Sequence, residues 1–300
     1  MSYMLYADCG KDALKSLFDA KNLYIKNRVY VGDEAPSGCY LVKYDGISYV
    51  VGDTANASPN YDTSKAIIEH KILCYLAMAL MVPNHSHVHL VTGMPVQLWA
   101  DRETRLRSIE YYKSEDTNGK VNITVDGIES TYSIDNVTIL AESSGYVYSR
   151  ADRYENALVG VLDIGGLNTN GAIYDGLNII KSSTFSINYG ASILRTEVKD
   201  AIRSKLGHNI QDYMIEHLMK KPTPEMVPVI REVKLNFMRK IIIEMKAHNW
   251  ELNLLDICAT GGGSNLMHEV IREVFPEVSI SSDSLWDNVR GWKTLMEAMA

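Results

Sequence analysis

Residues 158–166 read Leu-Val-Gly-Val-Leu-Asp-Ile-Gly-Gly. The apolar run predicts a buried β-strand, and the aspartate and glycines after it predict that the strand ends in a polar loop. About 155 residues earlier, Met4-Leu5-Tyr6-Ala7 leads in the same way into Asp8-Cys9-Gly10. A hairpin pattern follows each loop. We therefore expect an α/β protein with a duplicated core and a cleft between two lobes.

The rest of the chain alternates between strand and helix patterns. Further strands are expected at 23–31, 40–52, 87–92, 121–125, 130–134, 137–141, 172–174, 177–181 and 254–259. Helices are expected at 63–81, 100–113, 146–156, 191–206, 209–220, 223–248, 265–275 and 287–299. Asp-Gly pairs at 45–46, 126–127 and 175–176 predict tight hairpin turns.

Charge and cysteine content narrow the classes of function. The net charge is −7, which disfavours direct binding to DNA, so any link to DNA should pass through an adaptor. The four cysteines form no C-x-x-C pair, which argues against a zinc site or a disulfide framework and fits a reducing cytoplasm. The first ten residues lack a signal-peptide pattern, and the apolar run 72–82 is too short to span a bilayer, so we expect no membrane segment.

The loop after the first strand combines an acid, a glycine and a nearby base. Glycine at position 10 lets a ligand approach the backbone, whose N–H groups can cradle phosphate oxygens. Lys15 can neutralise a phosphate as a point charge, and Lys11 lies in the same loop. On its own this pattern also fits an ordinary Asp-Gly turn.

The second loop, Asp163 to Thr169, repeats the arrangement. Two aspartates at strand ends facing one cleft would hold a hydrated Mg²⁺, through its waters, and grip a polyphosphate from both sides. A second hairpin with polar turn residues is the alternative reading, but the pair of loops is far more specific than either alone.

A third glycine-rich segment, Thr260-Gly261-Gly262-Gly263-Ser264, stands between a buried strand and a helix. Three glycines cost chain entropy, which makes sense if a flat group lies against the backbone and an anion faces the helix N-terminus. The segment is neither a Walker A loop nor a G-x-G-x-x-G site. A flexible connection is the alternative.

Glu142 ends the strand expected at 137–141. A carboxylate there could orient a water for attack on a γ-phosphate, because phosphoryl transfer depends on positioning and charge neutralisation. It could equally be an acid that complements a helix dipole.

Taken in order, these motifs resemble those of the actin, chaperone and sugar-kinase superfamily. Asp8-x-Gly10 and 163–166 resemble its two phosphate loops, 260–264 its adenosine motif, and Asn288-Val289-Arg290-Gly291-Trp292 its C-terminal connecting helix. Val91-Thr92-Gly93-Met94-Pro95 is similar to a segment of the plasmid-segregation actins of the ParM and AlfA type.

The resemblance implies a duplicated ribonuclease-H-like actin fold, with two lobes around a nucleotide cleft. Domain I would comprise 1–145 and 286–300, with subdomain IB at about 25–62. Domain II would comprise 146–285, with a reduced, helical subdomain IIB at about 207–225, because no strand pattern separates Gly190 from Gly261.

The resemblance also implies an ATPase that binds Mg²⁺ and ATP, or GTP, and polymerises into cytoplasmic filaments that segregate plasmids through a ParR-like adaptor bound to centromeric DNA. Asp8 and Asp163 would organise the metal, and Glu142 would position the attacking water. The residues implied to contact the nucleotide are Gly10, Lys11, Lys15, Gly165, Gly166, Leu167, Asn168, Gly190, Arg203, Gly261, Gly262, Gly263 and Ser264.

Two positions depart from the family pattern. Leu167 and Asn168 stand where many relatives have small or hydroxyl residues.

A small-molecule kinase of the same superfamily is the alternative function, although the sequence shows no extra catalytic aspartate for a substrate hydroxyl. A non-catalytic scaffold is disfavoured by the presence of Glu142 and both aspartates.

Overall fold

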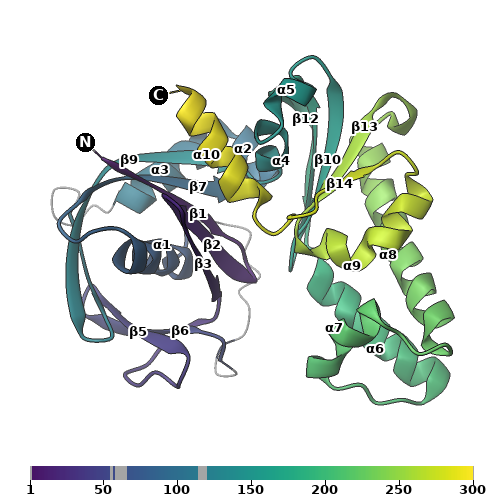
Figure 1. Ribbon diagram of the computed structural model, residues 1–300, viewed down its shortest axis with the longest axis horizontal. Coiled ribbons are helices and arrows are strands. Elements are labelled where there is room, and N and C mark those ends of the chain that lie inside the picture. Colours follow the sequence, from purple (N-terminus) through teal and green to yellow (C-terminus); the bar gives the residue numbers. More distant parts are fainter. Residues whose placement is uncertain (1, 55–56, 58–65, 114–119, 300) are drawn as a thin grey trace. The chain divides into compact units, whose positions relative to one another are not determined.

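The computed structural model describes residues 2–54, 57, 66–113 and 120–299. The chain separates into two units with their own cores: unit 1 comprises Met1–Ser149 and Asn288–Ala300, and unit 2 comprises Arg150–Asp287. Both units are mixed α/β structures (Figure 1). Among the described residues, no helix combines the length and apolarity that crossing a bilayer requires.

Unit 1 contains a nine-stranded sheet in the order β3-β2-β1-β7-β9-β8-β5-β6-β4. Its strands are β1 (Tyr3–Cys9), β2 (Ala13–Phe18), β3 (Lys21–Lys26), β4 (Val29–Val31), β5 (Cys39–Tyr44), β6 (Ile47–Gly52), β7 (His87–Met94), β8 (Lys120–Val125) and β9 (Ile128–Ala141). Its helices are α1 (Ile68–Met81), α2 (Val96–Ala100), α3 (Arg102–Lys113), α4 (Ser144–Tyr148) and α10 (Asp287–Met299).

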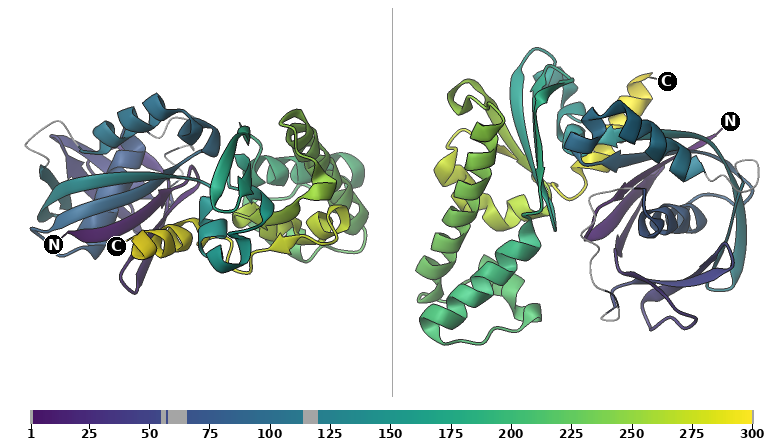
Figure 2. Two further views of the ribbon diagram at one scale, coloured as in Figure 1. Left: turned by 90° about the horizontal axis from the view of Figure 1, so that it is seen from above. Right: turned by 180° about the vertical axis from the view of Figure 1, so that it is seen from behind.

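The sheet of unit 1 curves around α1, as both views of that helix show (Figures 1 and 2). The buried residues of α1 form the centre of the unit 1 core, because apolar side chains cover most of the helix circumference. Alternation along β7 places Leu90 toward this core and Gly93 against Trp292 of α10. Helices α1 and α10 therefore pack on opposite faces of β7.

Unit 2 contains a five-stranded sheet in the order β12-β11-β10-β13-β14. Its strands are β10 (Leu158–Ile164), β11 (Thr169–Asp175), β12 (Asn178–Ile187), β13 (Asp256–Thr260) and β14 (Ser279–Ile280). Its helices are α5 (Ala151–Tyr154), α6 (Ala191–Leu206), α7 (Asp212–Lys220), α8 (Met226–Ala247) and α9 (Gly262–Val274), with a short 3₁₀ turn, η1, at Leu252–Leu254.

The two sheets share one strand plan. In unit 1, β3-β2-β1 are antiparallel neighbours, and β7 and β9 continue parallel to β1. In unit 2, β12-β11-β10 are antiparallel neighbours, and β13 and β14 continue parallel to β10. The duplication expected from the repeated Asp-loop pattern is thus a duplication of topology.

Several expected elements differ from the structure. Residues 23–31 belong to two strands, β3 and β4, because the chain turns at Asn27. The strands expected at 130–134 and 137–141 are one, β9, whose first half pairs with β8 and whose second half pairs with β7. The helix expected at 146–156 is two short helices, α4 and α5.

Several helix starts differ from their expected positions. Helix α9 begins at Gly262, three residues before the expected start, because glycines form its first turn. Helix α1 is described from Ile68, and positions 63–65 of the expected helix lie outside the described residues, as do positions 55–56 and 58–62 of the expected subdomain IB. Residues 191–251 are all described and contain helices α6 to α8 without a strand, in agreement with the reduced helical segment expected there.

Candidate functional site

In unit 1, two of the predicted acids lie at one edge of the sheet. Strands β1, β7 and β9 run parallel, so their carboxyl ends meet at the same edge, which is where ligands bind in open α/β sheets. Asp8 precedes the last residue of β1, and Glu142 directly follows β9. Both are buried, with 4% and 6% of their surface exposed. The Glu142 amide donates to the Met94 carbonyl at 2.8 Å, which fixes it beside the end of β7.

The first loop brings its acid, glycine and base together. Asp8 and Lys15 are register partners on β1 and β2, and Lys15 Nζ lies 3.0 Å from Asp8 Oδ2. A Cβ atom at position 10 would lie 3.0 Å from Lys15 Nζ, so the ammonium group sits directly beside the Gly10 backbone. Asn27 Nδ2 donates to the Gly10 carbonyl at 2.9 Å, and Lys11 is buried next to it. The Asn27 hydrogen bond therefore fixes the loop backbone, and the Lys15 ammonium group lies next to Gly10.

The segment after Glu142 is held by the C-terminal helix of unit 1. Ser143 has φ +82°, a left-handed conformation that is uncommon outside glycine, and its amide donates to Asn288 Oδ1 at 3.2 Å. Helix α10 approaches α4 so closely that a Cβ at Gly291 would lie 1.9 Å from the Gly145 carbonyl oxygen. The 288–292 motif thus positions the backbone that follows Glu142.

In unit 2, the second aspartate lies beside the glycine triplet. Strands β10 and β13 are parallel, and Asp163 is the register partner of Thr260. A Cβ at Gly261 would lie 2.3 Å from Asp163 Oδ1, and φ at Gly261 is +81°, so both space and conformation require glycine there. Helix α9 begins at Gly262, and a helix N-terminus favours anions. Carboxylate, glycine backbone and helix N-terminus therefore meet at one edge.

The second loop closes on the start of α6. The Gly165 amide donates to the Asn168 carbonyl at 2.8 Å, which forms the turn, and the Ala191 amide donates to the Gly165 carbonyl at 3.0 Å. A Cβ at Gly190 would lie 2.6 Å from the backbone carbon of Leu167, so this glycine permits the contact. The structure therefore brings the predicted residues Gly165, Gly190 and Asp163 into one corner of unit 2.

The remaining predicted residues of unit 2 differ in their placement. The Ser192 amide donates to the Gly166 carbonyl at 2.8 Å. The Leu167 side chain is 3% exposed, so it packs inside the protein. Ser264 Oγ donates to the Gly261 carbonyl at 2.8 Å. Arg203 stands apart: it occupies the last turn of α6 and pairs with Asp200 at 3.0 Å. It is 13 residues beyond Gly190, or about 20 Å along the helix axis at 1.5 Å per residue.

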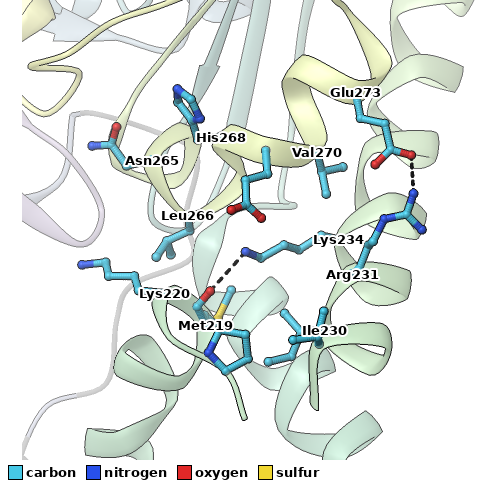
Figure 3. A pocket seen from close by; sticks show the side chains of 13 residues that line it. Met219, Lys220, Ile230, Arg231, Lys234, Asn265, Leu266, His268, Val270 and Glu273 are labelled. Carbon is cyan, nitrogen blue, oxygen red and sulfur yellow. Dashed lines mark hydrogen bonds and ion pairs between the residues drawn. The ribbon is translucent and has the colours of Figure 1, made fainter. Parts of the chain in front are cut away.

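A cavity of about 500 Å³ lies between α7, α8 and α9 of unit 2. Its lining combines apolar residues such as Met219, Ile230 and Leu266 with charged ones, so it is more polar than most small-molecule sites. Figure 3 shows Asn265, Leu266 and Lys220 at one end and the Arg231–Glu273 ion pair at the other. Asn265, the first residue of α9 that lines the cavity, lies two positions after Gly263, so this end of the cavity is near the glycine triplet in the chain.

Lys234 supplies a buried charge to the cavity, and sequence reasoning missed it. The side chain lies on α8, is 8% exposed, and donates from Nζ to the Met219 carbonyl at 3.3 Å (Figure 3). Burial lowers the pKa of its ammonium group, an effect that the Glu269 carboxylate partly offsets. Its signal in the sequence is one lysine in the apolar face of α8, between Ile230 and Met238.

Each unit carries one carboxylate of the kind that Mg²⁺ binds. Asp8 and Asp163 are carboxylates at strand ends, and oxygen ligands are the ones Mg²⁺ prefers, usually with several waters retained. Among the described residues, no group of three or more His, Cys, Asp or Glu side chains converges within the chain itself. At either loop, the one carboxylate present would hold Mg²⁺ together with the waters that the ion retains.

Comparisons with known proteins agree with the fold. Residues 7–145 match the family model of the N-terminal domain of actin-like proteins. No curated protein sequence matches the chain. Solved structures match over nearly its whole length: the Alp12 filament has 23% identity and a TM-score of 0.72, covering 100% of this chain and 99% of that one.

Two further structures have similar coverage, 99% of each chain. One is Ta0583, an archaeal actin homolog, in complex with ADP, with 17% identity and a TM-score of 0.77. The other is a 15-stranded ParM filament from Clostridium botulinum, with 15% identity and a TM-score of 0.77. Residues 7–145 therefore match the N-terminal domain of actin-like proteins, and the chain as a whole has the fold of these solved structures.

Proposed function

We propose that this protein is a filament-forming nucleoside triphosphatase that uses the aspartate loops of both units. The observation that carries the proposal is the repeated arrangement at the carboxyl ends of parallel strands: Asp8 with Gly10 and Lys15 in unit 1, and Asp163 with Gly261 and the start of α9 in unit 2. An archaeal actin homolog of the same fold has been solved with ADP, and Alp12 and ParM form filaments, which supports both parts of the proposal.

In this proposal the phosphates lie against the two loops and the helix N-terminus. Lys15 neutralises phosphate charge as a point charge, and the backbone at Gly10 and Gly261 approaches the phosphates because no Cβ intervenes. Bound Mg²⁺, held through water by Asp8 and Asp163, would supply further neutralisation of the triphosphate.

The nucleoside would enter the cavity between α7, α8 and α9. Its volume of about 500 Å³ falls in the range of ligand sites, and its Asn265 end is near the glycine triplet in the chain. Lys234 and Asn265 offer hydrogen bonds from a lining that mixes apolar and charged side chains. We place the base recognition of ATP or GTP here, on residues of unit 2 alone.

Glu142 would hold the attacking water. It is buried, and its backbone amide donates to the Met94 carbonyl at the end of β7, which fixes the main chain that carries the carboxylate. Hydrolysis would then proceed by positioning, which is the main contribution of proteins to phosphoryl transfer.

Filaments of this protein would act in plasmid DNA segregation, through an adaptor that carries the DNA contact. The net charge of −7 disfavours direct contact with DNA. The nearest functional alternative is a small-molecule kinase with the same core.

Light scattering and pelleting with Mg-ATP, Mg-GTP and Mg-ADP test the proposal directly. We expect polymer with a triphosphate, followed by phosphate release and disassembly. Phosphorylation of an added sugar without polymer would replace the proposal by the kinase alternative, and the absence of nucleotide binding would refute both.

A further inference from the structure

Two buried thiols meet between the first strand and the first helix of unit 1. Cys9 ends β1 and Cys74 lies in the middle of α1, and their Sγ atoms are 3.3 Å apart. Both residues are fully buried thiols, and Cys9 Sγ also donates to the His70 carbonyl at 3.7 Å. The contact joins residues 65 positions apart in the chain, so it is a product of the tertiary fold.

Cys9 connects this contact to the first loop. Cys9 stands between Asp8 and Gly10, the acid and the glycine of the first loop. Any movement of its side chain toward α1 therefore acts on the backbone that carries both. The other two cysteines are elsewhere: Cys39 begins β5, and Cys258 lies in unit 2 beside Tyr154.

We propose that Cys9 and Cys74 form a reversible disulfide that weakens nucleotide binding when the protein is oxidised. A disulfide requires the two sulfurs to approach from 3.3 Å to about 2.05 Å. Because phosphate contacts tolerate displacements of only about 0.5 Å, a pull on Cys9 would misplace the Asp8 carboxylate and the Gly10 backbone. The coupling to nucleotide rests on the proposed function, whereas the disulfide itself does not.

The oxidant is a peroxide, a molecule small enough to reach a buried thiol during local opening. The thiolate of one cysteine attacks hydrogen peroxide, giving a sulfenic acid and hydroxide. The second thiol then attacks the sulfenic sulfur, the S–S bond forms, and water leaves. The net reaction converts two thiols and one hydrogen peroxide into one disulfide and two waters, and a dithiol reductant reverses it.

The test treats the full chain with hydrogen peroxide, removes the excess, and counts thiols after unfolding in denaturant. We expect the count to fall from four to two, with a Cys9–Cys74 peptide in the proteolytic digest. The affinity for a fluorescent nucleotide should fall by about tenfold or more, equivalent to about 1.4 kcal/mol, and dithiothreitol should restore it.

Matched variants separate the pair from the other thiols. Cys74→Ala should bind nucleotide normally and lose the response to peroxide, whereas Cys39→Ala should keep it. If Cys74→Ala fails to fold, the disulfide peptide from the natural chain still decides the pairing.

Three results would overturn the proposal. Retention of four thiols, or a disulfide between other cysteines, would remove the pair. A Cys9–Cys74 disulfide with unchanged nucleotide affinity would remove the coupling. If the reduced protein bound no nucleotide, the proposed function and the coupling would fail together, while the disulfide would still be decided by the thiol count.

Discussion

The three glycines after β13 have different structural roles. A Cβ at Gly261 would meet Asp163 and Ile164, a Cβ at Gly263 would meet the Ile164 side chain at 2.5 Å, and a Cβ at Gly262 would have its nearest neighbour, Leu285, at 3.7 Å. Only Gly261 has positive φ. The triplet is therefore two required glycines around a permissive one.

Alanine substitutions should resolve these roles. We expect Gly262→Ala to keep or slightly raise stability, because alanine favours a helix by up to about 1 kcal/mol over glycine. Gly261→Ala and Gly263→Ala should each lower the unfolding free energy by about 1–3 kcal/mol through overpacking and strain. Urea unfolding measures all three, and equal losses at the three positions would contradict the placement of the helix start.

Glu142 and Asp163 should separate in kinetic assays. Glu142→Gln keeps size and hydrogen bonding but weakens the orientation of water, so we expect nucleotide binding to persist while phosphate release falls by about 10²-fold or more. Normal turnover in this variant would exclude a water-positioning role.

Asp163→Asn should instead reduce the affinity for the magnesium–nucleotide complex, because the carboxylate charge is lost. Titration of a fluorescent nucleotide with and without Mg²⁺ measures this, and Asp175→Asn, an exposed aspartate of the β11–β12 turn, is the control. An unchanged magnesium dependence would remove Asp163 from the site.

Burial of Lys234 should make the stability of the protein depend on pH. Burial lowers the pKa of Lys234 in the folded protein below its ordinary value of 10.5. Between the two pKa values the unfolded chain binds more protons, so this lysine makes the folded state more stable as pH rises through that window. Lys234→Met should therefore be more stable than the natural chain at neutral pH, with an advantage that shrinks as pH approaches about 10.5.

Urea unfolding at a series of pH values tests this expectation. Lys246→Met is the matched control, because Lys246 lies on the same helix and is exposed. Its effect should not change with pH. A Lys234→Met advantage that grew with pH would show that the folded protein holds this proton more tightly than the unfolded chain.

The sequence predicted which residues form local motifs, but not which distant residues contact each other. Asp8, Gly10 and Lys15 could be grouped because they are close in sequence, and the two strand-end aspartates because the pattern repeats. Lys234 could not be placed beside Asn265, since 31 residues and the packing of α8 on α9 separate them. The contact of Cys9 with Cys74 was beyond sequence reasoning for the same reason.

Helix α10 packs against the rest of unit 1 through small residues. Gly291 crosses Gly145 of α4, and Gly93 of β7 accepts the Trp292 ring, where a Cβ would lie 2.2 Å from the ring. Trp292 Nε1 also donates to Ser144 Oγ at 3.1 Å. The close crossing therefore depends on glycine at both contact points.

Gly291→Ala should force α10 and α4 apart. We expect a loss of about 1–3 kcal/mol of unfolding free energy, together with lower phosphate release, because Asn288 positions Ser143 beside Glu142. Thr294→Ala, on the exposed face of α10, is the control and should stay within about 0.5 kcal/mol of the natural chain. If both variants behaved alike, the crossing would not limit stability.

Long, strongly periodic elements could be predicted, as α6 and α10 were at their observed bounds. Short elements and junctions could not. The single strand β9 was expected as two because its pairing partner changes from β8 to β7 along its length. Helices α4 and α5 were expected as one because the break at Ser149 and Arg150 carries no glycine or proline.

Unit 1 is assembled from two separated parts of the chain, whereas unit 2 is continuous. Trp292 is fully buried in unit 1. Trp292→Ala should cost about 3–5 kcal/mol, and the loss should be confined to unit 1.

Hydrogen exchange with mass spectrometry measures where stability is lost. We expect faster exchange in β1, β7 and α4, with β10 and β13 of unit 2 unchanged. Equal acceleration in both units would show that they unfold as one cooperative body.

The separation of unit 1 into two parts also bears on biosynthesis. On the ribosome, all of unit 2 is translated before residues 288–299 appear, and domains generally fold as they emerge. The surface of β7 around Gly93 therefore stays uncovered until α10, which is translated more than 190 residues later, packs on it. A chaperone that recognises exposed apolar strands could bind β7 during this interval. Slow codons within the α10 coding region would lengthen the interval.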